Sequence, residues 1–243
     1  MKYGIQLYSV RDNTPHDMEG TLRALSEMGY EMVEFAGFFG HSAETVKGWL
    51  DRYGLVASGT HTGWQALRDD FDGTVAYHKT IGCNEIIVPG ADLSTPEKLD
   101  EFIDFMNQTA IRLGEVGIGL SYHNHDREFR VSSYGVVTHE ELQKRTAGVK
   151  FEIDTFWAYA AEKDPVAIME KLHAEDRLPV IHIKDGLSDG KGKPLGMGTA
   201  PVKAVWETAK RLGVPMVVES ETLTPDGLTE AKICIDYLKS LEA

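Results

Sequence analysis

The 243-residue sequence contains only two cysteines, Cys83 and Cys234, and no cluster of basic residues. The cysteines are far apart and each lies in an apolar segment, as is typical of buried free thiols in a reducing compartment. The net charge of −13 works against binding a polyanion, because nucleic-acid backbones are held mainly by clustered lysine and arginine. We therefore expect no nucleic-acid partner.

The sequence also lacks an apolar run of 18 residues and a basic leader segment followed by an apolar stretch. We therefore expect a cytoplasmic protein with no membrane partner. Hydrophobic residues make up 42% of the chain, which is enough to form a large core.

Short apolar runs alternate with stretches of helical periodicity, which is the pattern of a parallel sheet with crossover helices. Eight such pairs in 243 residues match the roughly 250 residues of an eightfold barrel, so we predict one (β/α)8 TIM-barrel domain over residues 1–243. The predicted strands are Gly4–Val10, Met32–Phe35, Val56–Thr60, Glu85–Pro89, Gly119–Asn124, Lys150–Asp154, Pro179–Lys184 and Pro215–Ser220. The predicted helices include His16–Met28, Ala43–Tyr53, Pro96–Val116, Asp164–His173, Pro201–Leu212 and Asp226–Leu241.

Functional groups of such a barrel lie where strands end at its C-terminal face. Because alternate residues of a strand share a face, Asp154 and His182 should point into the barrel, as should Glu219. Three such groups are costly to bury unless a cation compensates them, and carboxylates with imidazoles suit a divalent ion such as Mn, Mg, Co or Zn. A salt-bridged interior is the alternative.

Two further inward carboxylates, Glu34 and Glu152, lie lower in the predicted barrel. We interpret them as structural groups that pair with Lys150 or another buried cation. Lys184 could stabilise an oxyanion that develops during catalysis, or form a salt bridge to a neighbouring carboxylate such as Glu219.

Three residues near strand ends are candidates for contact with a substrate. Trp157 would form a pocket wall that stacks on sugar C–H groups, although core packing also explains it. His61 could instead be a hydrogen-bonded structural histidine, and Gln6 could cap a turn. The glycine-rich segment 190–198 lacks the pattern of a phosphate-binding loop, and we interpret it as a flexible lid.

Taken together, these positions give the sequence a resemblance to the sugar phosphate isomerase/epimerase family of xylose isomerase-like barrels. The matching segments are GIQLYSVRD at 4–12, YHNH at 122–125 with EF at 128–129, EIDTFW at 152–157, HIKDG at 182–186 and VVES at 217–220. The resemblance implies a TIM barrel that binds a divalent metal and acts on a small sugar.

Members of that family use a Glu, Asp, His, Glu metal set, and the resemblance implies Asp154, His182 and Glu219 as the last three. The strand that should supply the first ligand has no acidic residue but carries two histidines on one face. We assign His125 to the metal and His123 to proton transfer, and the reverse assignment stays open. Glu219 is a second candidate for the base.

The most consistent reading is an isomerase or epimerase that removes a proton next to the carbonyl of a keto sugar. A lyase or dehydratase acting on a keto sugar or keto polyol is the main alternative, and a non-catalytic sugar-binding barrel is another. Phosphodiester hydrolysis is disfavoured by the net charge and by too few ligands for a three-metal cluster. Association into a homo-oligomer is compatible with the fold.

Overall fold

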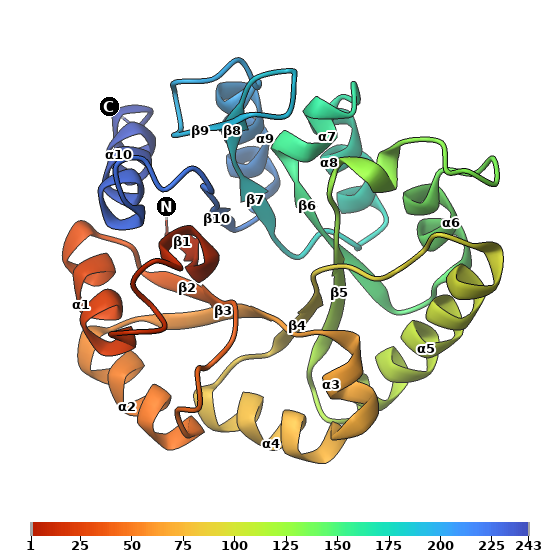
Figure 1. The fold of residues 1–243 in the computed structure, drawn as a ribbon, viewed down its shortest axis with the longest axis horizontal. Helices are drawn as coiled ribbons and strands as arrows, with labels where there is room; N and C mark the ends of the chain where they lie inside the picture. Colours follow the sequence, from red (N-terminus) through yellow and green to blue (C-terminus); the bar gives the residue numbers. More distant parts are fainter. Residues whose placement is uncertain (1, 243) are drawn as a thin grey trace.

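The computed structural model describes residues 2–242, which form a closed barrel of eight parallel strands inside a ring of helices (Figure 1). The strand order is β1-β10-β7-β6-β5-β4-β3-β2. The barrel strands are β1 (Tyr3–Gln6), β2 (Met32–Phe35), β3 (Val56–His61), β4 (Glu85–Val88), β5 (Gly119–His123), β6 (Val149–Asp154), β7 (Ile181–Ile183) and β10 (Met216–Val218). The TIM-barrel fold is confirmed, and the two terminal residues of the predicted domain, 1 and 243, lie outside the described part.

The outer helices connect consecutive strands and follow the chain around the barrel (Figure 1). They are α1 (Met18–Met28), α2 (Ala43–Tyr53), α4 (Phe71–Ile81), α5 (Pro96–Glu115), α6 (Thr138–Arg145), α8 (Pro165–Ala174), α9 (Val202–Leu212) and α10 (Gly227–Ser240). Within residues 2–242, no helix combines the length and apolar character needed to cross a membrane.

Short elements follow the carboxyl ends of several strands and shape the mouth of the barrel. They are η1 (Leu7–Val10), α3 (Trp64–Asp69), η2 (Asp126–Phe129), α7 (Thr155–Ala160) and the hairpin of β8 (Asp185–Gly186) and β9 (Gly192–Lys193). The sequence did not predict α3, α4, α6 or α7. Three of these helices are at most eight residues long, too short for a clear helical periodicity, and they owe their stability to packing on the barrel.

Alternation along the strands separates an apolar outer face from the barrel interior. Ile5, Val33, Phe151 and Ile183 are fully buried between strands and helices. Burying a side chain of this size stabilises the fold by about 1.5–3 kcal/mol. In each strand, the residues that alternate with these apolar ones point into the barrel. Many of the inward residues are polar.

The carboxyl end of the glycine-rich segment 190–198 is anchored to the side chain of Asp185. The carboxylate of Asp185 accepts hydrogen bonds from the backbone N–H groups of Gly186, Gly196, Gly198 and Ala200, at 2.7–3.2 Å. A Cβ at position 198 would lie 2.1 Å from Asp185 Oδ1, so this close approach requires glycine.

Candidate active site and metal-binding groups

A cavity of about 470 Å³ opens at the carboxyl ends of the barrel strands. Its walls include five residues that the sequence singled out, His61, His123, His125, Trp157 and Glu219. They come from four different strand ends, so the closure of the barrel brings them together. This location is where TIM barrels place their active sites.

Beside the floor of this cavity lies a group of four potential metal ligands, which we call the upper group: His123, Asp154, His182 and Glu219. One ligand atom of each residue lies within 4.8 Å of those of the others, and all four residues are buried. Of the two histidines between which the sequence left the fourth ligand open, His123 belongs to this group and His125 does not. The alternation along β5 explains the difference, since His123 ends the strand and His125 already belongs to the following loop.

Lys184 neutralises the carboxylates near the upper group. Its Nζ lies 2.9 Å from Glu219 Oε2, 2.8 Å from Glu221 Oε1 and 3.4 Å from Asp154 Oδ2. Burial opposes the charge of this lysine, but the three carboxylates outweigh burial and raise the pKa of Lys184 above its usual value. The side chain is 1% exposed, so it is a buried cation beside these carboxylates.

The carboxylates of Glu34 and Glu152 meet three histidines deeper in the barrel, and we call these five residues the lower group. His61 Nε2 lies 2.8 Å from Glu152 Oε2 and 3.1 Å from Glu34 Oε1. His182 Nε2 lies 2.8 Å from Glu34 Oε1, and His123 Nδ1 lies 3.1 Å from Glu152 Oε2. Histidines are thus the partners of both carboxylates, so the buried cations that pair with Glu34 and Glu152 are imidazoles and not Lys150.

A bulge in β3 brings His61 into this group. Val33 pairs with Ala57 but Glu34 pairs with Gly59, so β3 has one extra residue opposite β2. The extra residue shifts the alternation and turns His61 inward. A Cβ at position 59 would lie 3.1 Å from Glu34 Oε2, so the glycine leaves room for this carboxylate.

The imidazoles of the lower group differ in their affinity for protons. Burial lowers the pKa of His61, but Glu34 and Glu152 outweigh it and raise the pKa to about 9. The same carboxylates, together with Glu219, raise the pKa of His182 against the effect of burial. Burial dominates for His123 and lowers its pKa to about 3. Without a metal, His61 and His182 therefore carry the compensating protons and His123 is neutral.

His125 stands outside both groups and lines the cavity. Its Nδ1 is buried and has no hydrogen-bond partner among residues 2–242. Burial lowers the pKa of His125, which keeps the imidazole neutral near pH 7. Glu128 holds the backbone of this histidine, because Glu128 Oε2 accepts a hydrogen bond from the His125 N–H at 2.8 Å.

Gln6 does not contact the cavity, which corrects its assignment to substrate binding. The side chain is fully buried. Its Oε1 accepts a hydrogen bond from the Tyr8 N–H at 3.0 Å, and its Nε2 donates to Glu34 Oε1 at 2.6 Å. Gln6 therefore caps η1 and supports the lower group.

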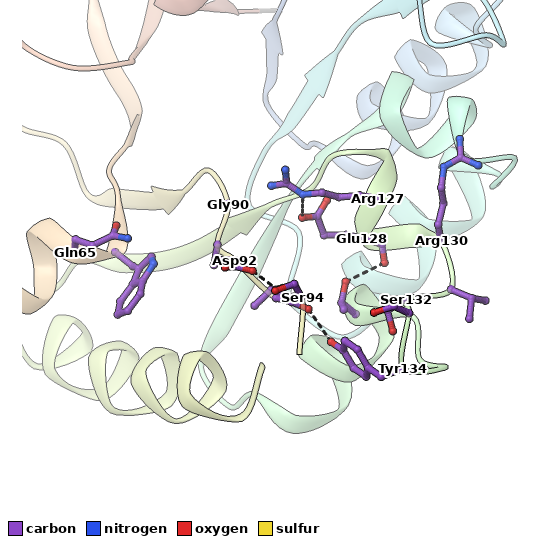
Figure 2. Close-up of a pocket in the computed structure, with 15 residues that line it drawn as sticks. Gln65, Gly90, Asp92, Ser94, Arg127, Glu128, Arg130, Ser132 and Tyr134 are labelled. Atoms are coloured by element: carbon purple, nitrogen blue, oxygen red, sulfur yellow. Dashed lines mark hydrogen bonds and ion pairs between the residues drawn. The ribbon is translucent and has the colours of Figure 1, made fainter. Parts of the chain in front are cut away.

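A second cavity of about 760 Å³ lies between the loop after β4 and the segment of η2 (Figure 2). The two cavities share a wall, because Pro89 lines the first and Gly90 the second. Figure 2 shows the Arg127 side chain reaching from η2 toward the Gly90 segment, and a Cβ at position 90 would lie 2.8 Å from Arg127 Nη2. The sequence interpretation identified neither this cavity nor Arg127. The two walls of the cavity lie about 40 residues apart in the chain, so no local pattern connects them.

Taken together, the fold and the site define a TIM-barrel protein with imidazoles and carboxylates at the carboxyl ends of its strands that could hold a divalent ion. Residues 22–241 match the family described as xylose isomerase-like TIM barrel. The chain belongs to this family.

Solved structures with the same fold include a sugar phosphate isomerase/epimerase from Parabacteroides distasonis. It is 25% identical, with a TM-score of 0.82 over 98% of this chain and 97% of the other. An IOLI protein with a bound zinc atom is 12% identical, with a TM-score of 0.76 over 99% and 98%. The probable 3-DHS dehydratase AsbF from Bacillus anthracis is also 12% identical, with a TM-score of 0.74 over 98% and 99%. No match was found among curated proteins.

Proposed function

We propose that this protein is a metal-dependent enzyme that isomerises a keto sugar or a similar small carbonyl compound. The observation that carries the proposal is a neutral imidazole, His125, that lines a cavity whose floor adjoins a group of metal ligands. This combination suits removal of a proton next to a carbonyl group. The similarity to a sugar phosphate isomerase/epimerase supports the same class of substrate.

The residues of the upper group fit a divalent ion such as Mn²⁺, Co²⁺, Zn²⁺ or Mg²⁺. Asp154 Oδ2 and His182 Nδ1 are buried and make no hydrogen bond within residues 2–242, which leaves both atoms free to act as ligands. Glu219 and His123 would complete the set. When bound, such an ion would supply Lewis-acid polarisation of a substrate carbonyl and its neighbouring hydroxyl group.

The protein's own residues divide the remaining work. His125 accepts the proton from the carbon next to the carbonyl and returns it to the neighbouring carbon. Glu128 fixes the loop that carries this histidine, and Trp157 offers an apolar face to the substrate. Lys184 does not touch the substrate but holds the carboxylate of Glu219 in position.

A single free base favours isomerisation over epimerisation. Isomerisation can remove and return a proton on the same face of an enediol, whereas epimerisation must return it on the opposite face. Of the carboxylates and imidazoles that line the cavity, Glu219 and Glu221 are paired with Lys184, and His61 and His123 with Glu152. His125 remains as the base without a side-chain partner.

The proposal is tested by incubating the protein with a panel of ketoses and Mn²⁺, Co²⁺ or Zn²⁺ in D₂O, and following the products by NMR. We expect deuterium to enter next to the carbonyl and an aldose to form. His125→Gln should lower kcat by about 100-fold or more while metal content is unchanged. His139→Gln is the control, because His139 is a buried histidine that lies outside both groups.

Two results would contradict this assignment. If no ketose exchanges deuterium with any of the three metals, the protein is not an isomerase of this class. If exchange is accompanied by loss of water from the substrate, the same proton abstraction leads to elimination, and the protein is a lyase.

A further inference from the structure

The lower group has the dimensions of a metal site. A tetrahedral ion with ligands at about 2.0–2.1 Å holds its ligand atoms roughly 3.3 Å apart. The imidazole nitrogens of His61, His123 and His182 lie 2.8, 3.1 and 3.3 Å from the nearest oxygens of Glu152. One ligand atom from each of these four residues lies within 4.8 Å of the others.

The charge of the lower group also suits a divalent cation. Glu34 and Glu152 are both fully buried, and within residues 2–242 neither makes an ion pair with a lysine or arginine. A buried carboxylate pair needs about two positive charges nearby, and one divalent ion supplies both. Glu34 Oε2 and Glu152 Oε1 are buried without any hydrogen-bond partner, which leaves one free oxygen on each carboxylate.

We propose that the lower group is a second metal site, distinct from the upper group, which binds a borderline divalent ion such as Zn²⁺ or Co²⁺. The imidazoles of His61 and His123 with the carboxylate of Glu152 form a nitrogen-rich ligand set, which favours these ions over Mg²⁺. Glu34 supplies a further carboxylate, either as a fifth ligand or as an acceptor that orients the imidazoles.

The two sites share histidines but do not compete for the same atoms. His182 directs Nε2 toward Glu34 and Nδ1 toward Glu219, where the distance is 3.4 Å. His123 directs Nδ1 toward Glu152. The lower ion can therefore use His61, His123 and Glu152, while the upper ion uses Asp154, Glu219 and His182 Nδ1.

The lower ion would lie beneath the floor of the substrate cavity. His61 and His123 line that cavity, so their rings separate the ion from the substrate. The ion would hold these two imidazoles in fixed orientations as part of the cavity floor. It is a structural site for a catalytic pocket, and it does not depend on which reaction the pocket supports.

The experiment measures zinc bound to the full-length protein by equilibrium dialysis against a weak chelator, followed by elemental analysis. We expect two zinc ions per chain. His61→Gln and Glu34→Gln should each lose one ion or bind it at least tenfold more weakly, because both residues belong only to the lower group. Asp154→Asn should lose the other ion, and His139→Gln should keep both.

Cobalt supplies a second measurement, since the visible absorption of Co²⁺ reports its ligands. Asp154→Asn loaded with cobalt should keep the spectrum of a nitrogen-rich site, and His61→Gln should not. Far-ultraviolet circular dichroism establishes that each variant is folded, and Glu34→Gln provides a replacement of equal size if His61→Gln fails to fold.

The proposal is overturned if the protein binds one ion that both His61→Gln and Glu34→Gln retain. A single ion that is lost in both His61→Gln and Asp154→Asn also overturns it, because the ligands would then form one site. A protein that binds two ions with the expected variant pattern but exchanges no deuterium contradicts the proposed reaction and leaves the second site supported.

Discussion

The two pairs of carboxylates inside the barrel are compensated by different kinds of cation. Asp154 and Glu219 in the upper group contact the ammonium of Lys184, whereas the ion pairs of Glu34 and Glu152 within residues 2–242 are all with imidazoles. A lysine keeps its proton throughout the neutral pH range and cannot serve as a ligand while it does so. An imidazole can exchange its proton for a metal ion.

Because of this difference, the upper group and the lower group should respond differently to pH and to metal. The upper group keeps a permanent positive charge next to its carboxylates, which holds their ligand atoms in place even without a metal. The lower group can change between two protonated histidines and one divalent ion at almost constant net charge. Its stability should therefore depend on pH and on metal, and that of the upper group should depend on Lys184.

The largest effect is expected for Lys184→Met, which removes the fixed cation of the upper group. Three carboxylates would then lie together with only the imidazolium of His182 beside Glu219, and the free energy of unfolding of the metal-free protein should fall by about 3–5 kcal/mol. Urea denaturation in the presence of a chelator measures this change. Adding Glu219→Gln to the same chain should recover part of the lost free energy of unfolding. If the effects of the two substitutions simply add, Lys184 does not compensate the charge of Glu219.

A smaller, pH-dependent effect is expected for His61→Gln in the lower group. The pKa of His61 is about 9 in the folded protein, against about 6.5 when unfolded, so its protonation stabilises the fold below pH 6.5. That contribution is lost as the pH rises through 9. The free energy by which His61→Gln destabilises the metal-free protein should therefore shrink by about 3 kcal/mol between pH 6 and pH 10, as measured by urea denaturation at both values. An unchanged difference would mean that His61 is not the protonated imidazole.

The smallest effect concerns Glu85, a carboxylate near the bottom of the barrel with neither kind of close cation. Burial raises its pKa to about 7, so the folded protein resists its ionisation and loses stability as the pH rises from 4.5 through 7. Glu85→Gln removes this penalty and should stabilise the protein at pH 8, by less than about 3 kcal/mol because solvent screens this partly exposed group, and by almost nothing at pH 4. Thermal unfolding at both pH values provides the measurement, and equal shifts would show that ionisation of Glu85 is not the cause.

The alternation of apolar and polar residues was sufficient to predict the barrel and most of the residues at its mouth. It placed His182 inside the barrel opposite two outward isoleucines, and it placed Asp154 in the same way beside Phe151 and Ile153. These predictions succeeded because side-chain direction in a strand follows a period of two, which is a local property of the chain.

The tertiary structure alone decided which of these inward residues contact one another in the upper group and in the lower group. The extra residue in β3 turns His61 inward, and no local pattern marks where two strands fall out of register. Whether Glu152 meets Lys150 or three histidines depends on the stagger of neighbouring strands around the closed barrel. The choice between His123 and His125 likewise depends on where β5 ends and its loop begins. The sequence by itself therefore determined which side chains enter the barrel, and strand register determined which of them meet, because contacts between strands join residues that are distant in the chain.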